Sequence, residues 1–378
     1  MDAIHPNLAH GTSRAQLDAA AADLLATVPT ATDDELMVGV LRIVAMVSYG
    51  GCDAHTGAFI WGSGTYPVDS LPLRLWLFED DVVIVDALPP YQGLIGSRID
   101  TVDDTVMTDI LAALYPVIPR DNAQTLRLLA PRYLLIPQVL RGLDMANDGD
   151  VTLGLTDDAG ARQAVDVAPI PMAAYNTWAG PYGLHLPADP NVEYLSRIDE
   201  ALWWKRLPDV ETLFIQDNRV DRLPSTTLND LRSALHAPDV AHVILDVRHN
   251  FGGEVSAVDP ILTLFKDPAV DRPGRLSLIT GRNTFSAASL LVARLDRDTG
   301  ATVVGEEMGG CPTAYGNPTD VTLPSSGIVV SVAGMLEVGV SADDTRQSIE
   351  PDVLAELTRS AWEDGRDPAR EAIVGIGP

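Results

Sequence analysis

The sequence is short of cysteine and of lysine. Of its 378 residues, two are cysteines, Cys52 and Cys311, and two are lysines, Lys205 and Lys266. Two cysteines cannot build a disulfide framework, and without a CxxC pair or a Cys/His cluster the sequence does not predict a zinc site. The scarcity of lysine also leaves few side chains that could act as a catalytic lysine base.

Positive charge and long apolar runs are scarce as well. The chain carries 26 basic and 53 acidic side chains, a formal net charge of -27, which repels nucleic-acid phosphates and anionic lipids at long range. The longest helical apolar stretch, residues 36–47, is broken by Arg42. We therefore expect no nucleic-acid partner and no membrane insertion. No export signal is visible near the N-terminus, so the cytoplasm is the default expectation and secretion stays open.

The N-terminal half is typical of two short helices followed by a β-rich module. Ser13 and Thr32 each begin a capping box, which predicts helices at 14–28 and 33–48. Periodicity and turn residues then predict further elements: strands at 71–78 and 82–88, a turn, strand, turn and helix over 93–114, helices over 125–143, and a hairpin over 150–167.

The C-terminal half alternates strands and helices. We predict strands at 212–217, 242–248, 275–280 and 301–305, and helices at 226–235, 255–265 and 286–295. Such alternation favours a layered βαβ core with strands buried on both faces. The tract from Pro169 to Pro190, with five prolines, is predicted to be a linker. Trp203 and Trp204 are expected in packing, with a groove lining as the alternative.

Two stretches of this half could carry chemistry. "LDVRHNFGG", residues 245–253, leaves a strand in a diglycine turn, whose bare amides suit an oxyanion hole or an ordinary turn. "NTFSAAS", residues 283–289, places Ser286 at a helix start, where free amides and the helix dipole favour an alkoxide. A capping role is the alternative for Ser286, and Thr284 or Ser289 could be confused with it.

A third stretch, "GGCDAHTGAF", holds His55 on a loop after the second predicted helix. Histidine has the side chain whose unperturbed pKa lies nearest neutrality, so it can take a proton from a serine hydroxyl and return it to a leaving group. A plain surface histidine is the alternative.

In this order and at these separations, the three stretches resemble the tail-specific, or C-terminal-processing, serine proteases, and more closely the branch related to the tricorn protease core. That family has an early D-G-H-T loop, a D-L-R-x-N-x-G-G strand-turn and a T-x-S-A-x-(S/E) helix start. Here "DAHT" stands at 53–56, "DVRHNFGG" at 246–253 and "TFSAAS" at 284–289. "VVGE" at 303–306 and "IEPDV" at 349–353 resemble further landmarks, and residues 93–107 resemble a degenerate PDZ module.

The departures from the family select one of its branches. One branch uses a Ser-Lys dyad, but Cys311 and Ser289 stand where that branch has its lysine and a glutamate. The other branch pairs the serine with the early histidine and a late acid. The resemblance therefore implies that Ser286 works with His55.

For the acid, the resemblance points to the run shortly before Pro351. This run offers Asp343, Asp344 and Glu350, and Asp344 is our choice. A solvated acidic loop is the alternative interpretation.

The same resemblance bears on the cysteines. Cys52 lies three residues before His55 and Cys311 stands at the family lysine position, so both loops could face one site. Two unrelated buried thiols are the expectation, with a thiol pair or disulfide as the alternative.

The resemblance implies an α/β fold with a layered βαβ core similar to ClpP and crotonase. Residues 1–70 would form a helical segment carrying the DAHT loop, residues 71–168 a PDZ-like module with a helical and hairpin connection, and residues 169–378 the protease core. The active site would be assembled from distant parts of the chain.

The implied activity is that of a serine-type peptidase acting on peptide or protein substrates. Ser286 would attack a carbonyl, His55 would act as general base and then acid, and Asp344 would orient it. The amides of Gly252, Gly253 and Ala287 are the candidates for the oxyanion hole. No metal or organic cofactor is required, and homo-oligomerisation stays open. The alternatives are a degenerate ligand-binding protein on the same fold, or a serine hydrolase or acyl-transfer enzyme acting on a small molecule.

Overall fold

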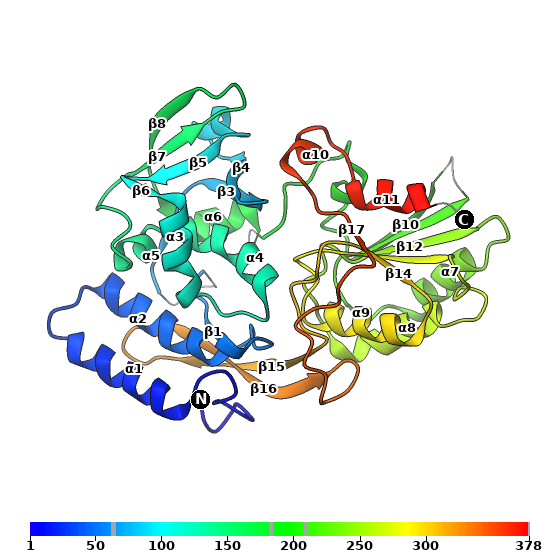
Figure 1. Ribbon diagram of the computed structural model, residues 1–378, viewed down its shortest axis with the longest axis horizontal. Coiled ribbons are helices and arrows are strands. Elements are labelled where there is room, and N and C mark those ends of the chain that lie inside the picture. The colour runs from blue at the N-terminus through cyan, green and yellow to red at the C-terminus, as the bar shows by residue number, and fades with distance from the viewer. Residues whose placement is uncertain (62–65, 181–183, 208–210, 377–378) are drawn as a thin grey trace. The chain divides into compact units, whose positions relative to one another are not determined.

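The computed structural model describes residues 1–61, 66–180, 184–207 and 211–376 and forms two compact units. Unit 1 consists of Met1–Pro187 with Tyr315–Met335, and unit 2 of Ala188–Ala314 with Leu336–Pro378. Each unit is thus built from two separate stretches of chain (Figure 1). The three-part division at residues 70 and 168 stays a prediction.

Unit 1 begins with the two helices that the capping boxes predicted. Helices α1 (Arg14–Thr27) and α2 (Asp33–Ala45) start after Ser13 and Thr32, and both reciprocal caps are present. The 3₁₀ helix η1 (Met46–Gly50) continues α2. Gly51, with a φ of 85°, then turns the chain into the loop that carries His55.

The β-rich part of unit 1 is an antiparallel sheet with its strands in the order β3-β4-β5-β7-β8, and β6 pairs with β5. The strands are β3 (Leu73–Phe78), β4 (Asp81–Ala87), β5 (Arg98–Val102), β6 (Thr105–Val106), β7 (Val151–Thr156) and β8 (Arg162–Val167). The helices are η2 (Tyr91–Leu94), α3 (Met107–Leu114), η3 (Tyr115–Val117), α4 (Ala123–Leu134) and α5 (Pro137–Gly142). These elements confirm the strands, helices and hairpin predicted for this half.

The prediction of a linker from Pro169 to Pro190 is wrong for the part of it that the structure describes. Strand β9 (Ile170–Pro171) pairs with β2 (Asp69–Ser70), and α6 (Met172–Ala179) follows directly. Tyr175 of α6 is buried, and the guanidinium of Arg132 lies 4.2 Å from its ring centroid. Proline content misled the prediction because proline is also tolerated in short edge strands and at helix starts. Residues 181–183 of the tract lie outside the described residues.

A second, three-stranded sheet has the order β1-β16-β15. It joins β1 (Gly57–Ala58) to the hairpin of β15 (Thr313–Thr322) and β16 (Val329–Val338), with Gly57 opposite Ser331. Since β1 follows the His55 loop directly, this pairing fixes one end of that loop.

Unit 2 is built on a six-stranded sheet with the order β10-β11-β12-β13-β14-β17. Only β10 is antiparallel to its neighbour. The strands are β10 (Leu202–Leu207), β11 (Thr212–Asp217), β12 (His242–Asp246), β13 (Leu276–Thr280), β14 (Thr302–Gly305) and β17 (Val353–Leu354). The helices are η4 (Glu193–Leu195), α7 (Ser225–Leu235), η5 (Val255–Ala257), α8 (Val258–Phe265), α9 (Ala287–Asp298), α10 (Arg359–Glu363) and α11 (Pro368–Ile376).

Two apolar layers enclose this sheet. Helices α7, α8 and α9 pack on one face around residues such as Leu245 and Leu278, and α11 packs on the other around Ile244 and Ile279 (Figure 1). The predicted βαβ core with strands buried on both faces is therefore confirmed. Trp203 and Trp204 pack against opposite layers, which confirms that they belong to the packing.

The parallel strands all end at the same edge of the sheet. The loops that follow β11, β12 and β13 therefore come together there, which is where open α/β sheets generally bind ligands. Among the residues described, no helix combines the length and the apolar composition that crossing a bilayer requires.

Asp217, at the end of β11, predicts an unusual pH dependence of stability. Its side chain is 1% exposed, and burial raises the pKa of its carboxyl to about 8. Because this pKa lies above the unfolded value of about 4, the folded state loses stability as pH rises from about 4 to 8. The loss should be about 1.4 kcal/mol per pH unit.

Asp217→Asn should remove that loss, because the amide mimics the neutral carboxyl. We expect its free energy of unfolding in urea to exceed that of the wild type increasingly from pH 5 to pH 8. Asp230→Asn, on the exposed face of α7, should follow the wild type. Parallel profiles for Asp217→Asn and wild type would contradict a neutral buried carboxyl.

Candidate active site

Ser286 lies in the sharp turn between β13 and α9. It occupies the N-cap position of α9 with φ 56° and ψ -127°, and its side chain makes no capping hydrogen bond to the helix. A positive φ at a residue other than glycine is strained, and such strain persists only where the surrounding structure imposes it. The capping interpretation of Ser286 is therefore wrong.

The other two hydroxyls of "TFSAAS" are buried and bonded to the backbone. Thr284 donates to the Val247 carbonyl at 2.9 Å, and Ser289 donates to the Thr284 carbonyl at 3.2 Å. Ser286 is partly exposed, whereas Phe285 and Ala287 on either side of it are buried. Of the three hydroxyl-bearing residues, Ser286 is the one that is partly exposed.

The diglycine turn lies directly against Ser286. A Cβ atom on Gly252, which has a φ of +97°, would stand 2.6 Å from the Ser286 Cβ and 3.0 Å from the Ala287 nitrogen. Gly253 has a φ of +145°, and a Cβ there would stand 2.3 Å from the Val220 carbonyl oxygen. Glycine is therefore required twice, once for the approach to Ser286 and once for the approach to Val220.

Asn250 holds the loops of three strands together. Its carbonyl accepts from the Phe285 amide at 3.1 Å, and its side-chain amide donates to the Asp217 carbonyl at 3.0 Å. Its Oδ1 accepts from the Gly252 amide at 2.9 Å. The Gly252 N–H is thus already engaged, whereas the amide of Ala287, in the first turn of α9, has no acceptor within its own helix.

Two buried arginines stabilise the same edge of the sheet through ion pairs. Arg248 pairs with Asp246 at 2.9 Å and makes a two-pronged contact with Asp367 at 2.8 and 2.9 Å. Arg282 pairs with Glu306 at 2.9 Å. Sequence reasoning quoted Asp246, Arg248 and Glu306 in motifs but missed the pairing of the arginines with Asp367 and Glu306, because these partners lie 119 and 24 residues away along the chain.

His55 lies in unit 1, on the loop between η1 and β1, and is partly exposed. The loop is held to the segment just before α4 through Asp121, whose carboxylate accepts from the Ala54 amide at 2.7 Å. Desolvation lowers the pKa of His55, opposed by the negative charge of Asp53 and by a hydrogen bond to the Tyr315 backbone. The neutral imidazole, the form that can accept a proton, is thus favoured.

The candidate acids lie in unit 2, and two of them have close partners. Asp344 accepts from the Arg346 backbone and guanidinium at 2.8–3.1 Å, which lowers its pKa. Asp343 is exposed and accepts from the Ser341 hydroxyl at 2.6 Å. Glu350 is exposed. Asp344 is the most buried of the three, with a side chain 7% exposed.

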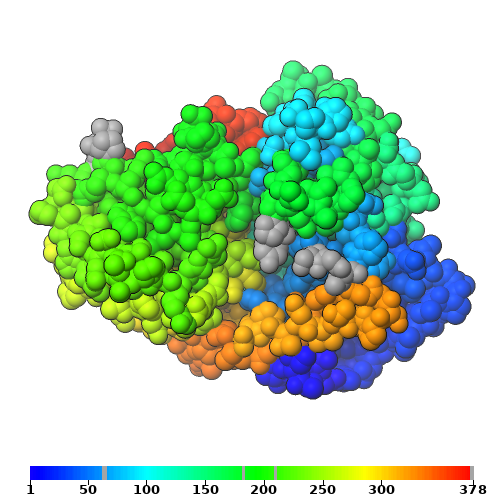
Figure 2. All heavy atoms as spheres, turned by 180° about the vertical axis from the view of Figure 1, so that it is seen from behind, coloured from blue at the N-terminus to red at the C-terminus, as the bar shows by residue number. Residues whose placement is uncertain are grey.

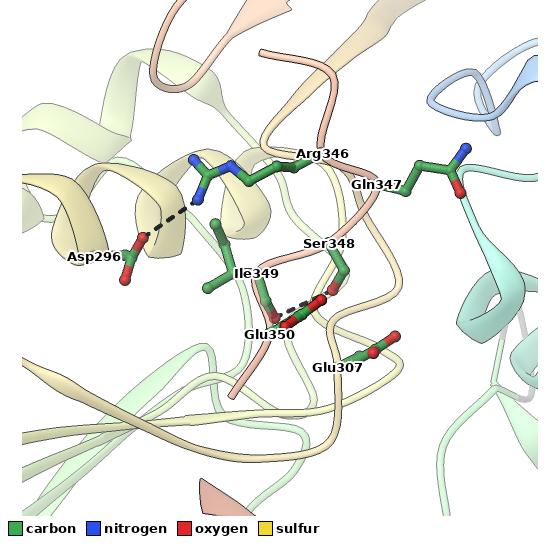
Figure 3. Close-up of a pocket in the computed structure, with 7 residues that line it drawn as sticks. All are labelled: Asp296, Glu307, Arg346, Gln347, Ser348, Ile349 and Glu350. Carbon is green, nitrogen blue, oxygen red and sulfur yellow. Dashed lines mark hydrogen bonds and ion pairs between the residues drawn. The ribbon is translucent and has the colours of Figure 1, made fainter. Parts of the chain in front are cut away.

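A pocket of about 480 Å³ lies along this acidic run. In Figure 3 the guanidinium of Arg346 points toward Asp296, at 3.7 Å. The residues that line the pocket include one cationic and three carboxylate side chains, and Ser286 is not among them. They are Asp296, Glu307, Arg346, Gln347, Ser348, Ile349 and Glu350.

Both cysteines are disulfide-bonded. The expectation that Cys52 and Cys311 are two unrelated thiols is therefore wrong. The alternative that the resemblance offered, a disulfide, is the one observed, although no cysteine spacing motif points to it.

The fold has solved counterparts. Neither a protein-family model nor a curated protein matches the sequence. Mature CPAF complexed with lactacystin matches with a TM-score of 0.63 at 14% identity, covering 99% of this chain and 94% of that chain. The chain has the fold of mature CPAF.

Two further solved structures match at lower TM-scores. The photosystem II D1 C-terminal processing protease matches at a TM-score of 0.41 and 16% identity, over 95% of this chain and 90% of that chain. Tricorn protease matches at 0.42 and 13% identity, over 96% and 34%. The α/β fold class is confirmed by the CPAF comparison.

The contact of Gly252 with Ser286 predicts a steric cost that a control can isolate. Gly252→Ala should lose about 2–5 kcal/mol of unfolding free energy, about 1–2 from the positive φ and the rest from overpacking. Gly149 has a φ of +98° with open space around it, so Gly149→Ala should show the first part alone. Equal losses in urea unfolding would contradict the close approach.

Proposed function

We propose that the protein is a serine-type peptidase of the tail-specific kind, acting on peptide or protein substrates. The observation that carries the proposal is the Ser286 turn. There a partly exposed serine lies on strained backbone at a helix start, and Gly252 approaches its Cβ so closely that no side chain would fit between them. The likeness of fold to CPAF and the three motifs in family order support it.

Each residue has a chemical role in this proposal. Ser286 attacks the substrate carbonyl, while His55 takes the hydroxyl proton and later gives it to the leaving amine. The Gly253 and Ala287 amides receive the oxyanion and lower the barrier by about 3 kcal/mol. We leave the Gly252 amide out of this role because it donates to Asn250.

Asp344 is the proposed acid partner of His55. Its low pKa keeps it ionised across the neutral range, as a carboxylate that stabilises an imidazolium must be. Its bond to Arg346 means that the arginine would hold the carboxylate in place.

An active-site serine probe tests the proposal. Wild type should react covalently with a fluorophosphonate and cleave casein, because the probe and the peptide bond need the same activated hydroxyl. Ser286→Ala and His55→Ala should each lose labelling and reduce cleavage by at least about a thousandfold. The readouts are gel fluorescence and the release of soluble peptides.

Ser225→Ala is the matched control, since Ser225 is an exposed serine in the first turn of α7. It should label and cleave like the wild type. A folded wild type that neither labels nor cleaves would point to a binding protein, and labelling with turnover of simple esters alone would point to a small-molecule hydrolase.

The pH dependence of kcat/KM follows from His55. The base must be neutral, and desolvation lowers its pKa from the usual 6.5. Activity should therefore rise with pH and reach its plateau at a pH below that expected for an ordinary exposed histidine. Measurement of kcat/KM on a fluorogenic peptide from pH 4.5 to 8 tests this, and a midpoint above 6.5 would contradict it.

A further inference from the structure

Two histidines near the N-terminus converge on one buried carboxylate. The Nε2 atoms of His5 and His10 each lie 3.0 Å from Oδ2 of Asp53. The Asp53 side chain is fully buried, and that of His10 is 13% exposed. Figure 2 shows the N-terminal segment, in dark blue, lying against the orange β15–β16 hairpin.

The tautomer of His5 follows from its second hydrogen bond. The Asn7 backbone amide donates to Nδ1 of His5 at 3.0 Å, so Nδ1 is the acceptor nitrogen and the proton of a neutral ring lies on Nε2. His5 therefore donates to Asp53. Because an ionised carboxylate only accepts, His10 donates as well.

These donors offset the cost of burying a charge. Burial by itself would raise the pKa of Asp53, but the hydrogen bonds from His10, His5 and Thr56 outweigh it and hold the pKa below its usual value. The carboxylate thus stays ionised at neutral pH, although water does not reach it.

We call the arrangement of His5 and His10 around the Asp53 carboxylate the histidine clamp. Asp53 belongs to the loop that carries His55. The negative charge of Asp53 raises the pKa of His55 and so opposes the larger lowering by desolvation. The Tyr315 ring lies over both clamp histidines, with centroids 4.7 and 4.5 Å away, and the Tyr315 backbone makes a hydrogen bond with His55. Asp121 anchors the same loop by accepting from the Ala54 amide.

We propose that Asp53 is a positioning residue for His55 and that His5 and His10 hold the Asp53 carboxylate in place. The N-terminal segment that carries these two histidines would then contribute to catalysis. The inference rests on the proposed role of His55 as general base. Asp53 supplies a fixed negative charge that stabilises the imidazolium formed when His55 takes the serine proton. It touches no reacting atom.

The same three side chains could also suit a divalent cation, since their ligand atoms lie within 4.8 Å of one another. The hydrogen bond from the Asn7 backbone amide favours the histidine clamp over a metal site. A histidine that binds a metal through Nε2 normally donates its other ring N–H to an acceptor, whereas Nδ1 of His5 faces a donor.

Histidine NMR tests the proposal without any need for peptidase activity. In Asp53→Asn, which removes the charge and keeps the size, the pKa of His55 should fall by about one pH unit. His10→Ala should lower it in the same direction, and His10→Gln, which keeps an N–H donor, should restore most of the wild-type value. His236→Gln, which breaks a half-exposed histidine–aspartate pair at 3.2 Å, should leave His55 unchanged.

Kinetics adds a readout that simple loss of structure would not produce. In Asp53→Asn and His10→Ala the acidic limb of the kcat/KM profile should move to lower pH along with the His55 titration. The plateau kcat should fall by about tenfold, with KM little changed. If the protein cleaves no peptide at all, the proposed function fails, while the NMR titration still decides the link between Asp53 and His55.

Two results would overturn the inference. The first is an unchanged His55 titration in folded Asp53→Asn, or in His10→Ala if the former does not fold. The second is one tightly bound zinc per chain in the purified protein, with the His5 and His10 resonances shifting when EDTA removes it, which would make the cluster a metal centre.

Discussion

The approach of the Gly252 backbone to Ser286 is the constraint on which the candidate site depends. At this contact there is no room for a side chain on one partner, and the other partner is held in backbone geometry that serine does not adopt by itself. Asn250 maintains it by bonding to both loops and to the end of β11. The strain at Ser286 is thus compensated by a network of bonds at the carboxyl ends of parallel strands.

Buried charge around the site is almost entirely compensated. Arg248 and Arg282 are each paired with carboxylates, and Asp53 is held by two imidazoles. Asp217 is the exception, and there burial makes the neutral form prevail. Desolvation sets the cost in all these cases, and charged or hydrogen-bonding partners keep Asp53, Arg248 and Arg282 ionised, whereas Asp217 lacks enough of them.

The errors of the sequence interpretation share a cause. The tract after Pro169 was predicted to be a linker from its prolines, yet Tyr175 in it is buried against Arg132. His5 and His10 attracted no prediction, because their partner Asp53 lies more than forty residues away. For the same reason two unrelated thiols were expected at Cys52 and Cys311, with the disulfide only as the alternative. Composition records the residues of a segment but not what packs on it.

The sequence by itself determined the capped helices and the alternation of strands and helices, because these depend on periodicity and short-range bonding. It also held the motifs around His55, the diglycine and Ser286, which their resemblance to a known family picked out. Only the tertiary structure decided which hydroxyl of "TFSAAS" is partly exposed, which glycine approaches it, and which amide is already engaged by Asn250. It also brought His5 and His10 to Asp53. These features depend on contacts between distant residues, and such contacts exist only once the loops and strands have packed.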